Sequence, residues 1–171
     1  VRSGSYSVSR PFLLVTKGTE SKLVKDFLKF TESAEGQAIT NEMKFIGAID
    51  APEEYTASGM SGTIKVAGST SVAPLMEKLQ EAYNELNPDV TFETQAQGSS
   101  QGIKAAIDGS YDIGMASREL KAEEASELNR YVLAIDGIAV IVNNENPKSD
   151  LAADDITNIY IGEITKWNEV K

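Results

Sequence analysis

Histidine and cysteine are both missing from this sequence of 171 residues. Without cysteine, the chain can form no disulfide, no thiolate metal site and no cysteine nucleophile. Without histidine, a Ser-His-Asp triad, an imidazole metal site and a histidine general base are all excluded. The lack of cysteine does not by itself separate an exported protein from a cytosolic one.

Positive charge and long apolar runs are scarce as well. The chain has 16 basic and 26 acidic residues and a formal net charge of −10, which argues against nucleic acid or an anionic membrane surface as its main partner because both attract basic patches. An anionic small molecule is compatible with this charge, since backbone N–H donors act locally and salt screens the overall field within about 10 Å. No apolar run of about 18 residues is present, and no signal-peptide segment follows the N-terminal VRSGSYSVSR. We expect a globular protein with no targeting segment in this chain.

Short apolar segments alternate with helical patterns from residue 63 onward. We expect strands at 63–67, 90–94, 112–116, 131–135 and 138–142, and helices at 72–86, before Gly109, at 121–129 and at 153–160. Strands that alternate with helices predict a mostly parallel sheet with helices on both faces. In such sheets ligands bind at the carboxyl ends of the strands, which here carry Gly/Ser turns.

The first sixty residues follow a different pattern. A strand is expected at 6–15, and helices at 20–30 and 35–43. Residues 48–62 show no periodicity, and their small and polar residues predict a flexible linker. The chain therefore consists of two blocks joined by a linker.

The stretch QAQGSSQG, residues 95–102, is open to two interpretations. Gly98-x-Ser100-x-Gly102 matches the nucleophile elbow of serine hydrolases. That chemistry needs a base, but the chain has no histidine and no Ser-x-x-Lys pattern surrounds Ser100. The other interpretation is a Gly-Ser-Ser turn that opens a helix, where free N–H groups and the helix dipole attract an anion.

A similar turn, Gly68-Ser69-Thr70-Ser71, precedes the helix expected at 72–86. From the residues alone, an ordinary Ser/Thr helix cap and an anion site are both open, and the cap is the simpler interpretation. Two such turns at the ends of neighbouring parallel strands favour the anion site, because their donors converge on one point.

Several long segments resemble a known family. TIKVAGSTSVAPLMEKLQEAYNELNP, QAQGSSQGIKAAIDGSYDIGMASREL, YVLAIDGIAVIVN and IGEITKWNEV resemble the first half of the phosphate-binding proteins of phosphate ABC transporters, whereas SGSYSVSRPFLLVTKG and LVKDFLKFTESAEGQAI resemble their carboxy-terminal end. The resemblance implies a three-layer α/β/α lobe of the type II periplasmic-binding-protein fold, with a mostly parallel sheet and one antiparallel strand. It also implies a non-enzymatic, extracytoplasmic protein that needs no cofactor or metal and docks on a transporter permease.

The order of these segments differs from that of the family. Residues 1–47 match the family's C-terminal segment, residues 63–171 match its N-terminal segment, residues 48–62 join the old termini, and no second lobe is recognised. We expect a single, circularly permuted lobe over residues 1–171. A piece of a tandem fusion is the alternative, but it would leave both blocks without the partners that bury their apolar faces.

The resemblance places the phosphate contacts in the two turns. Thr70, Ser71 and Ser99 match the family's phosphate-contacting positions. Neighbouring hydroxyls in the turns are further candidates: Ser69, Ser100 and Ser117.

Arg118 stands where some family members have an aspartate that accepts a hydrogen bond from protonated phosphate. A guanidinium would instead offer a bidentate fork to an oxyanion. Asp136 either supplies the missing acceptor or pairs with Arg118. Arg10, next to the hinge, is expected to form a salt bridge.

Because the other lobe's donors are not recognised, we expect inorganic phosphate to bind this lobe weakly. Self-association into a homodimer through the exposed cleft face is the alternative.

Overall fold

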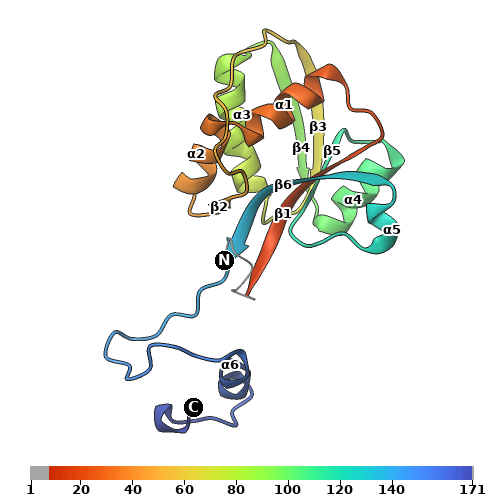
Figure 1. Cartoon of the computed structure of the whole chain (residues 1–171). Helices are drawn as coiled ribbons and strands as arrows, with labels where there is room; N and C mark the ends of the chain where they lie inside the picture. Colours follow the sequence, from red (N-terminus) through yellow and green to blue (C-terminus); the bar gives the residue numbers. More distant parts are fainter. Residues whose placement is uncertain (1–7, 171) are drawn as a thin grey trace. The chain divides into compact units, whose positions relative to one another are not determined.

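A computed structural model describes residues 8–170 of the chain (Figure 1). The chain divides into two compact units, Val1–Ile138 (unit 1) and Ala139–Lys171 (unit 2). The single, circularly permuted lobe over residues 1–171 stays a prediction. Among the described residues, no helix is long and apolar enough to cross a membrane.

Unit 1 is built on a six-stranded mixed sheet with the strand order β2-β6-β1-β5-β3-β4. The strands are β1 (Ser9–Lys17), β2 (Ile46–Gly47), β3 (Gly62–Gly68), β4 (Val90–Ala96), β5 (Ile113–Ala116) and β6 (Leu128–Gly137). β3 pairs in parallel with β4 and β5, while β1 lies antiparallel between β5 and β6. The edge strand β2 runs antiparallel to β6. β3, β4, β5 and β6 therefore run in the same direction, and the long strand β1 runs antiparallel to them. This agrees with the expectation of a mostly parallel sheet.

Helices cover both faces of this sheet. α1 (Lys22–Glu32), α2 (Ala34–Glu42) and α3 (Ala73–Leu86) lie on one side in Figure 1, and α4 (Ser99–Asp108) and α5 (Ala122–Ala125) lie on the other. Successive side chains of β1 point to opposite faces of the sheet, which explains the two cores. Phe12 and Leu14 belong to the cluster that contains residues of α1 and α3, whereas Leu13 and Val15 pack with Ile103 of α4. The expected three-layer α/β/α architecture is confirmed.

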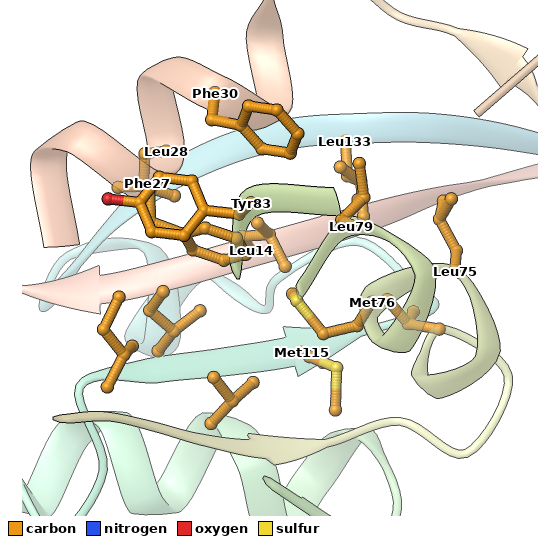
Figure 2. Close-up of a cluster of buried hydrophobic side chains, with 14 of the residues drawn as sticks. Leu14, Phe27, Leu28, Phe30, Leu75, Met76, Leu79, Tyr83, Met115 and Leu133 are labelled. Atoms are coloured by element: carbon orange, nitrogen blue, oxygen red, sulfur yellow. The ribbon is translucent and has the colours of Figure 1, made fainter. Parts of the chain in front are cut away.

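The larger core is rich in aromatic rings. Phe27 and Phe30 of α1 pack edge-on against Tyr83 of α3, with ring centroids 5.1 and 5.4 Å apart. Figure 2 shows these rings beside Leu14 and the side chains of α3. Such edge-to-face pairs add about 0.5–1.5 kcal/mol each beyond the area that they bury.

The segment between β2 and β3 has no helix or strand, as expected of a linker, but it is not loosely attached. Tyr55 is only 8% exposed, and its ring packs on Phe30 with centroids 5.2 Å apart. The Tyr55 hydroxyl donates to Asp26 Oδ2 at 2.5 Å, and Asn87 Oδ1 accepts hydrogen bonds from the N–H groups of Ser58 and Gly59. The flexible linker at residues 48–62 stays a prediction; the Tyr55 ring and these hydrogen bonds attach the segment to unit 1.

Two other element predictions need correction. The helix expected at 121–129 is limited to α5, because β6 already starts at Leu128 and this side chain is buried in the smaller core. The strand expected at 138–142 does not form: Ser9 pairs with Gly137, and the β1–β6 ladder ends at that pair. The apolar run that follows belongs to unit 2, in which α6 (Ala153–Tyr160) has the expected bounds and a 3-10 helix spans Trp167–Glu169.

Candidate anion-binding site

The turns after β3, β4 and β5 meet at one edge of the sheet, because these three strands are parallel neighbours. Ser69 donates its N–H to the Met115 carbonyl at 3.0 Å, and Gly98 donates its N–H to the Gly68 carbonyl at 2.8 Å. Ser117 N–H donates to Ser99 Oγ at 3.1 Å. The structure therefore brings the three predicted turns together.

Two glycines allow this close approach. Gly68 has a φ of +143°, and a Cβ there would lie 2.2 Å from the Met115 carbonyl oxygen. A Cβ on Gly102 would lie 2.4 Å from the Gly68 Cα, so the first turn of α4 rests directly on β3. Gly98, with a φ of +98°, makes the turn itself. The Gly-x-Ser-x-Gly spacing thus reflects a turn glycine and a packing glycine.

In the turn before α3, Ser69 is buried and has a capping role. Its Oγ accepts the N–H of Ser71 at 3.2 Å, and its carbonyl accepts those of Val72 and Ala73 at 3.2 and 3.1 Å. The side chain of Thr70 is exposed and that of Ser71 is half-buried. Both are accessible to a ligand, while Ser69 shapes the turn that presents them.

Ser99 is the first residue of α4, and its hydroxyl is oriented by a neighbour. Because Ser99 Oγ accepts the Ser117 N–H, its own hydrogen must point elsewhere. Ser117 Oγ lies 3.3 Å away, so the two hydroxyls stand side by side and at least one hydrogen remains for a ligand. Gly98 caps α4 without a side chain, and Ser100 in the first turn is exposed. The first turn of α4 thus starts beside this pair of hydroxyls without a side-chain cap.

Arg118 does not present a free fork. Its guanidinium makes two hydrogen bonds to the Glu124 carboxylate, at 2.8 and 2.9 Å, and a third to the Glu119 carbonyl at 2.8 Å. The Arg118 hydrogen bonds, together with the Lys121 N–H, lower the pKa of Glu124 to about 2 despite its partial burial. Nothing in the sequence marks Glu124 as this partner. The fork that we expected to meet an oxyanion holds α5 instead, and a ligand role for Arg118 stays a prediction.

Asp136 pairs with Arg10, so the predicted alternative of a pair with Arg118 was wrong. Arg10 and Asp136 are directly opposite in the β1–β6 ladder, and Nε lies 2.9 Å from Oδ2. The Arg10 guanidinium also lies 5.6 Å from the Phe12 ring centroid. The salt bridge expected for Arg10 is confirmed; at 41% and 21% side-chain exposure it contributes about 0–1 kcal/mol.

Known proteins contain the same fold. Residues 53–171 match the family described as the PBP superfamily domain. The chain belongs to the PBP superfamily. "Phosphate-binding protein PstS 2" of Streptococcus pneumoniae is 44% identical over all 171 residues, which are 100% of this chain and 59% of that protein. The chain thus spans less than two thirds of this relative.

Two solved members of phosphate transport systems are also similar. The crystal structure of a phosphate-binding protein of a phosphate ABC transporter from Streptococcus pneumoniae is 44% identical, with a TM-score of 0.94 over 99% of this chain and 66% of that one. A putative phosphate ABC transporter substrate-binding protein from Clostridium perfringens, solved with bound phosphate, is 47% identical over 63% of this chain and 45% of its own, with a TM-score of 0.51. The resemblance inferred from the sequence motifs is confirmed.

Proposed function

We propose that unit 1 binds inorganic phosphate at the edge formed by the three turns, as one lobe of a substrate-binding protein of an ABC transporter. The observation that carries this proposal is the Ser99 hydroxyl, which Ser117 N–H orients so that its hydrogen is directed to a neighbour or a ligand. The starts of α3 and α4 converge on the same edge, and helix N-termini favour anions. The relatives named as phosphate-binding proteins support the same ligand.

The contacts that we assign are donors. Thr70, Ser71 and Ser99 supply hydroxyl and N–H groups, with Ser100 and Ser117 beside them, and Ser69 holds the first turn in shape. A tetrahedral oxyanion needs several donors around it, and hydrogen bonds to a charged acceptor are worth about 1.5–3 kcal/mol each. Hydroxyls and N–H groups supply these donors without a positive side chain.

The preference for phosphate over sulfate requires an acceptor for the proton of hydrogen phosphate. Asp136 is the carboxylate that we assign to this role, near the start of β1 where Arg10 already fixes its orientation. Arg118 contacts the anion only if its pair with Glu124 opens. In both cases a charged partner sets the position of the group.

The wider setting is part of the proposal. We place the working protein outside the cytoplasm, docked on the permease of an ABC transporter; the solved Streptococcus pneumoniae relative, a phosphate-binding protein of a phosphate ABC transporter, supports the transporter setting. The circularly permuted order of the segments stays a prediction; the Streptococcus pneumoniae relative aligns with all 171 residues of this chain. Self-association through the cleft face stays a separate prediction, which light scattering over a range of concentrations tests.

The site is tested by titrating phosphate into the full chain and following backbone amide signals by NMR. We expect the signals of Thr70, Ser71 and Ser99 to shift with an affinity weaker than micromolar, and sulfate to shift them less. Ser99→Ala should weaken phosphate binding about tenfold or more. Ser110→Ala, two residues beyond the end of α4, is the control and should leave phosphate binding unchanged.

Micromolar or tighter phosphate affinity in calorimetry would overturn the prediction of weak binding. Shifts that spread over unit 1 without a focus at these three residues, or equal effects of the two serine variants, would overturn the site itself.

A further inference from the structure

We propose that Glu124 is a positioning residue of the anion-binding site, which acts by holding the side chain of Arg118 in place. The pair fixes the turn after β5, and with it the Ser117 N–H that orients the Ser99 hydroxyl. The inference rests on the proposed function, because it concerns the same site. Arg118 stays paired with Glu124 while phosphate is bound, so both residues act on the ligand only through the turn.

The turn that contains Ser117 lies beyond the sheet. β5 ends at Ala116, which is also the last residue of β5 that pairs with β1. Among the described residues, no strand pairs with residues 117–121. Leu120 is only partly buried where it packs against the smaller core. Side-chain contacts therefore determine where the backbone of this turn lies.

Glu124 joins this turn to α5 at two points. Its carboxylate oxygens accept hydrogen bonds from Arg118 Nη1 and Nη2 at 2.8 and 2.9 Å, and Oε2 also accepts the N–H of Lys121 at 2.8 Å. A bidentate pair of a guanidinium and a carboxylate fixes the geometry of both groups. The side chains of Glu124 and Arg118 are 13% and 33% exposed, so salt screens this pair less than a fully exposed one.

Ser117 transmits the position of this pair to the ligand site. It directly precedes Arg118, and neighbouring Cα atoms are held about 3.8 Å apart. Its N–H donates to Ser99 Oγ at 3.1 Å, near the long end of the ordinary range for such a hydrogen bond. A small displacement of the turn would therefore break this contact, and the Ser99 hydroxyl would lose its fixed direction.

A second ion pair in the same turn provides a control. Glu119 forms a bidentate pair with Arg130 of β6, at 2.9 and 3.2 Å. Their side chains are 63% and 40% exposed, and such exposed pairs contribute little to stability. The Glu119 carboxylate has the same charge as that of Glu124 but does not hold Arg118. The loss of a negative charge in this turn can therefore be separated from the loss of the Arg118 pair.

Phosphate titrations of the full chain and its variants separate positioning from direct contact. Glu124→Gln and Arg118→Gln should each weaken phosphate binding about three- to tenfold. The double variant should bind no more weakly than the weaker single variant, because both changes break the same pair. Glu119→Gln should leave the affinity unchanged.

Direct contact between Arg118 and phosphate predicts the opposite sign for one variant. The loss of the Glu124 charge would then free the guanidinium, so Glu124→Gln would tighten phosphate binding while Arg118→Gln weakens it. That pattern would overturn the proposal. Unchanged affinity in both single variants, or additive losses in the double variant, would overturn it as well.

Amide hydrogen exchange of the chain without phosphate tests the positioning itself. Glu124→Gln should speed exchange of the Ser117 amide at least about tenfold. The Gln97 and Gly98 amides, which donate to the Gly68 carbonyl in the neighbouring turn, should change less than about twofold. Unchanged exchange at Ser117, or equal increases at all three amides, would overturn the proposal. If the unaltered chain binds no phosphate, the proposed function fails, and this measurement still decides whether Glu124 positions Ser117.

Discussion

Two short apolar runs in this protein have opposite environments. Residues 12–15, FLLV in β1, are at most 1% exposed, whereas Val140, Ile141 and Val142 in unit 2 are 40–88% exposed. β1 lies between β5 and β6 and under helices on both faces, while the second run pairs with no strand among the described residues. An apolar run in the sequence therefore indicates side chains that favour burial, but the neighbouring strands and helices determine whether they are buried.

The largest effect should come from truncating one leucine of the buried run. Leu14→Ala removes a fully buried side chain and should lower the free energy of unfolding by about 2–5 kcal/mol. Ile141→Ala, the matched change in the exposed run, should stay within about 0.5 kcal/mol. Urea unfolding followed by circular dichroism measures both. Similar losses in the two variants would break the contrast between the units.

A glycine contact inside unit 1 should have the next largest effect. In Gly102→Ala the new methyl group would lie 2.4 Å from the Gly68 Cα, so α4 must move off β3 at a cost of about 1–3 kcal/mol. Gly98→Ala is the control, because its Cβ meets open space and only the positive φ costs free energy, about 1–2 kcal/mol. The same unfolding measurement applies. An unchanged stability of Gly102→Ala would show that α4 packs less tightly than described.

The anchor of the segment between β2 and β3 should have a moderate effect. Tyr55→Phe removes the donor to Asp26 while keeping the ring in the core, and should cost about 1 kcal/mol. It should also speed limited proteolysis between residues 49 and 61. Tyr160→Phe, on an 84% exposed ring of unit 2, should change neither quantity. If Tyr55→Phe leaves proteolysis unchanged, the ring alone holds the segment.

The smallest effect should be a pH dependence in unit 1. Arg118 lowers the pKa of Glu124 to about 2, below the ordinary value of 4.5. The ionised carboxylate therefore stabilises the fold above about pH 4.5, and this contribution is lost as the pH falls towards 2. Glu124→Gln should flatten the decline of stability over this window, whereas Glu163→Gln in unit 2 should leave its slope unchanged. Thermal unfolding at a series of pH values provides the measurement.

Local patterns predicted most elements but not their partners. The spacing of apolar residues predicted α6 with its bounds and the positions of β3, β4 and β5, because helical and strand periodicity depend on residues that are close in the sequence. The pairing of Arg10 with Asp136, 126 positions apart, depends on the register between β1 and β6. No local pattern contains that register, so the partner of Asp136 was mistaken.

The candidate site divides in the same way. The turns with Thr70 and Ser99 were predictable because glycine and serine mark the ends of parallel strands. The hydrogen bond from Ser117 N–H to Ser99 Oγ was not, because it depends on how closely α4 lies on β3. Gly102 allows this close packing, but in the sequence it is one of several glycines in a glycine-rich motif, and its packing role is not evident there. Arg118 was assigned to the ligand from its place in the turn after β5, and no local pattern marks Glu124, in a helix of only four residues, as its partner.

The position of β1 also bears on how the protein emerges from the ribosome. This strand is made before both of its sheet neighbours, which lie at Ile113–Ala116 and Leu128–Gly137. Contacts between segments so distant along the chain slow folding, because a long loop must close before they form. The middle of the sheet therefore stays open until β5 and β6 have been made, and the apolar side chains of β1 remain without their strand neighbours until then.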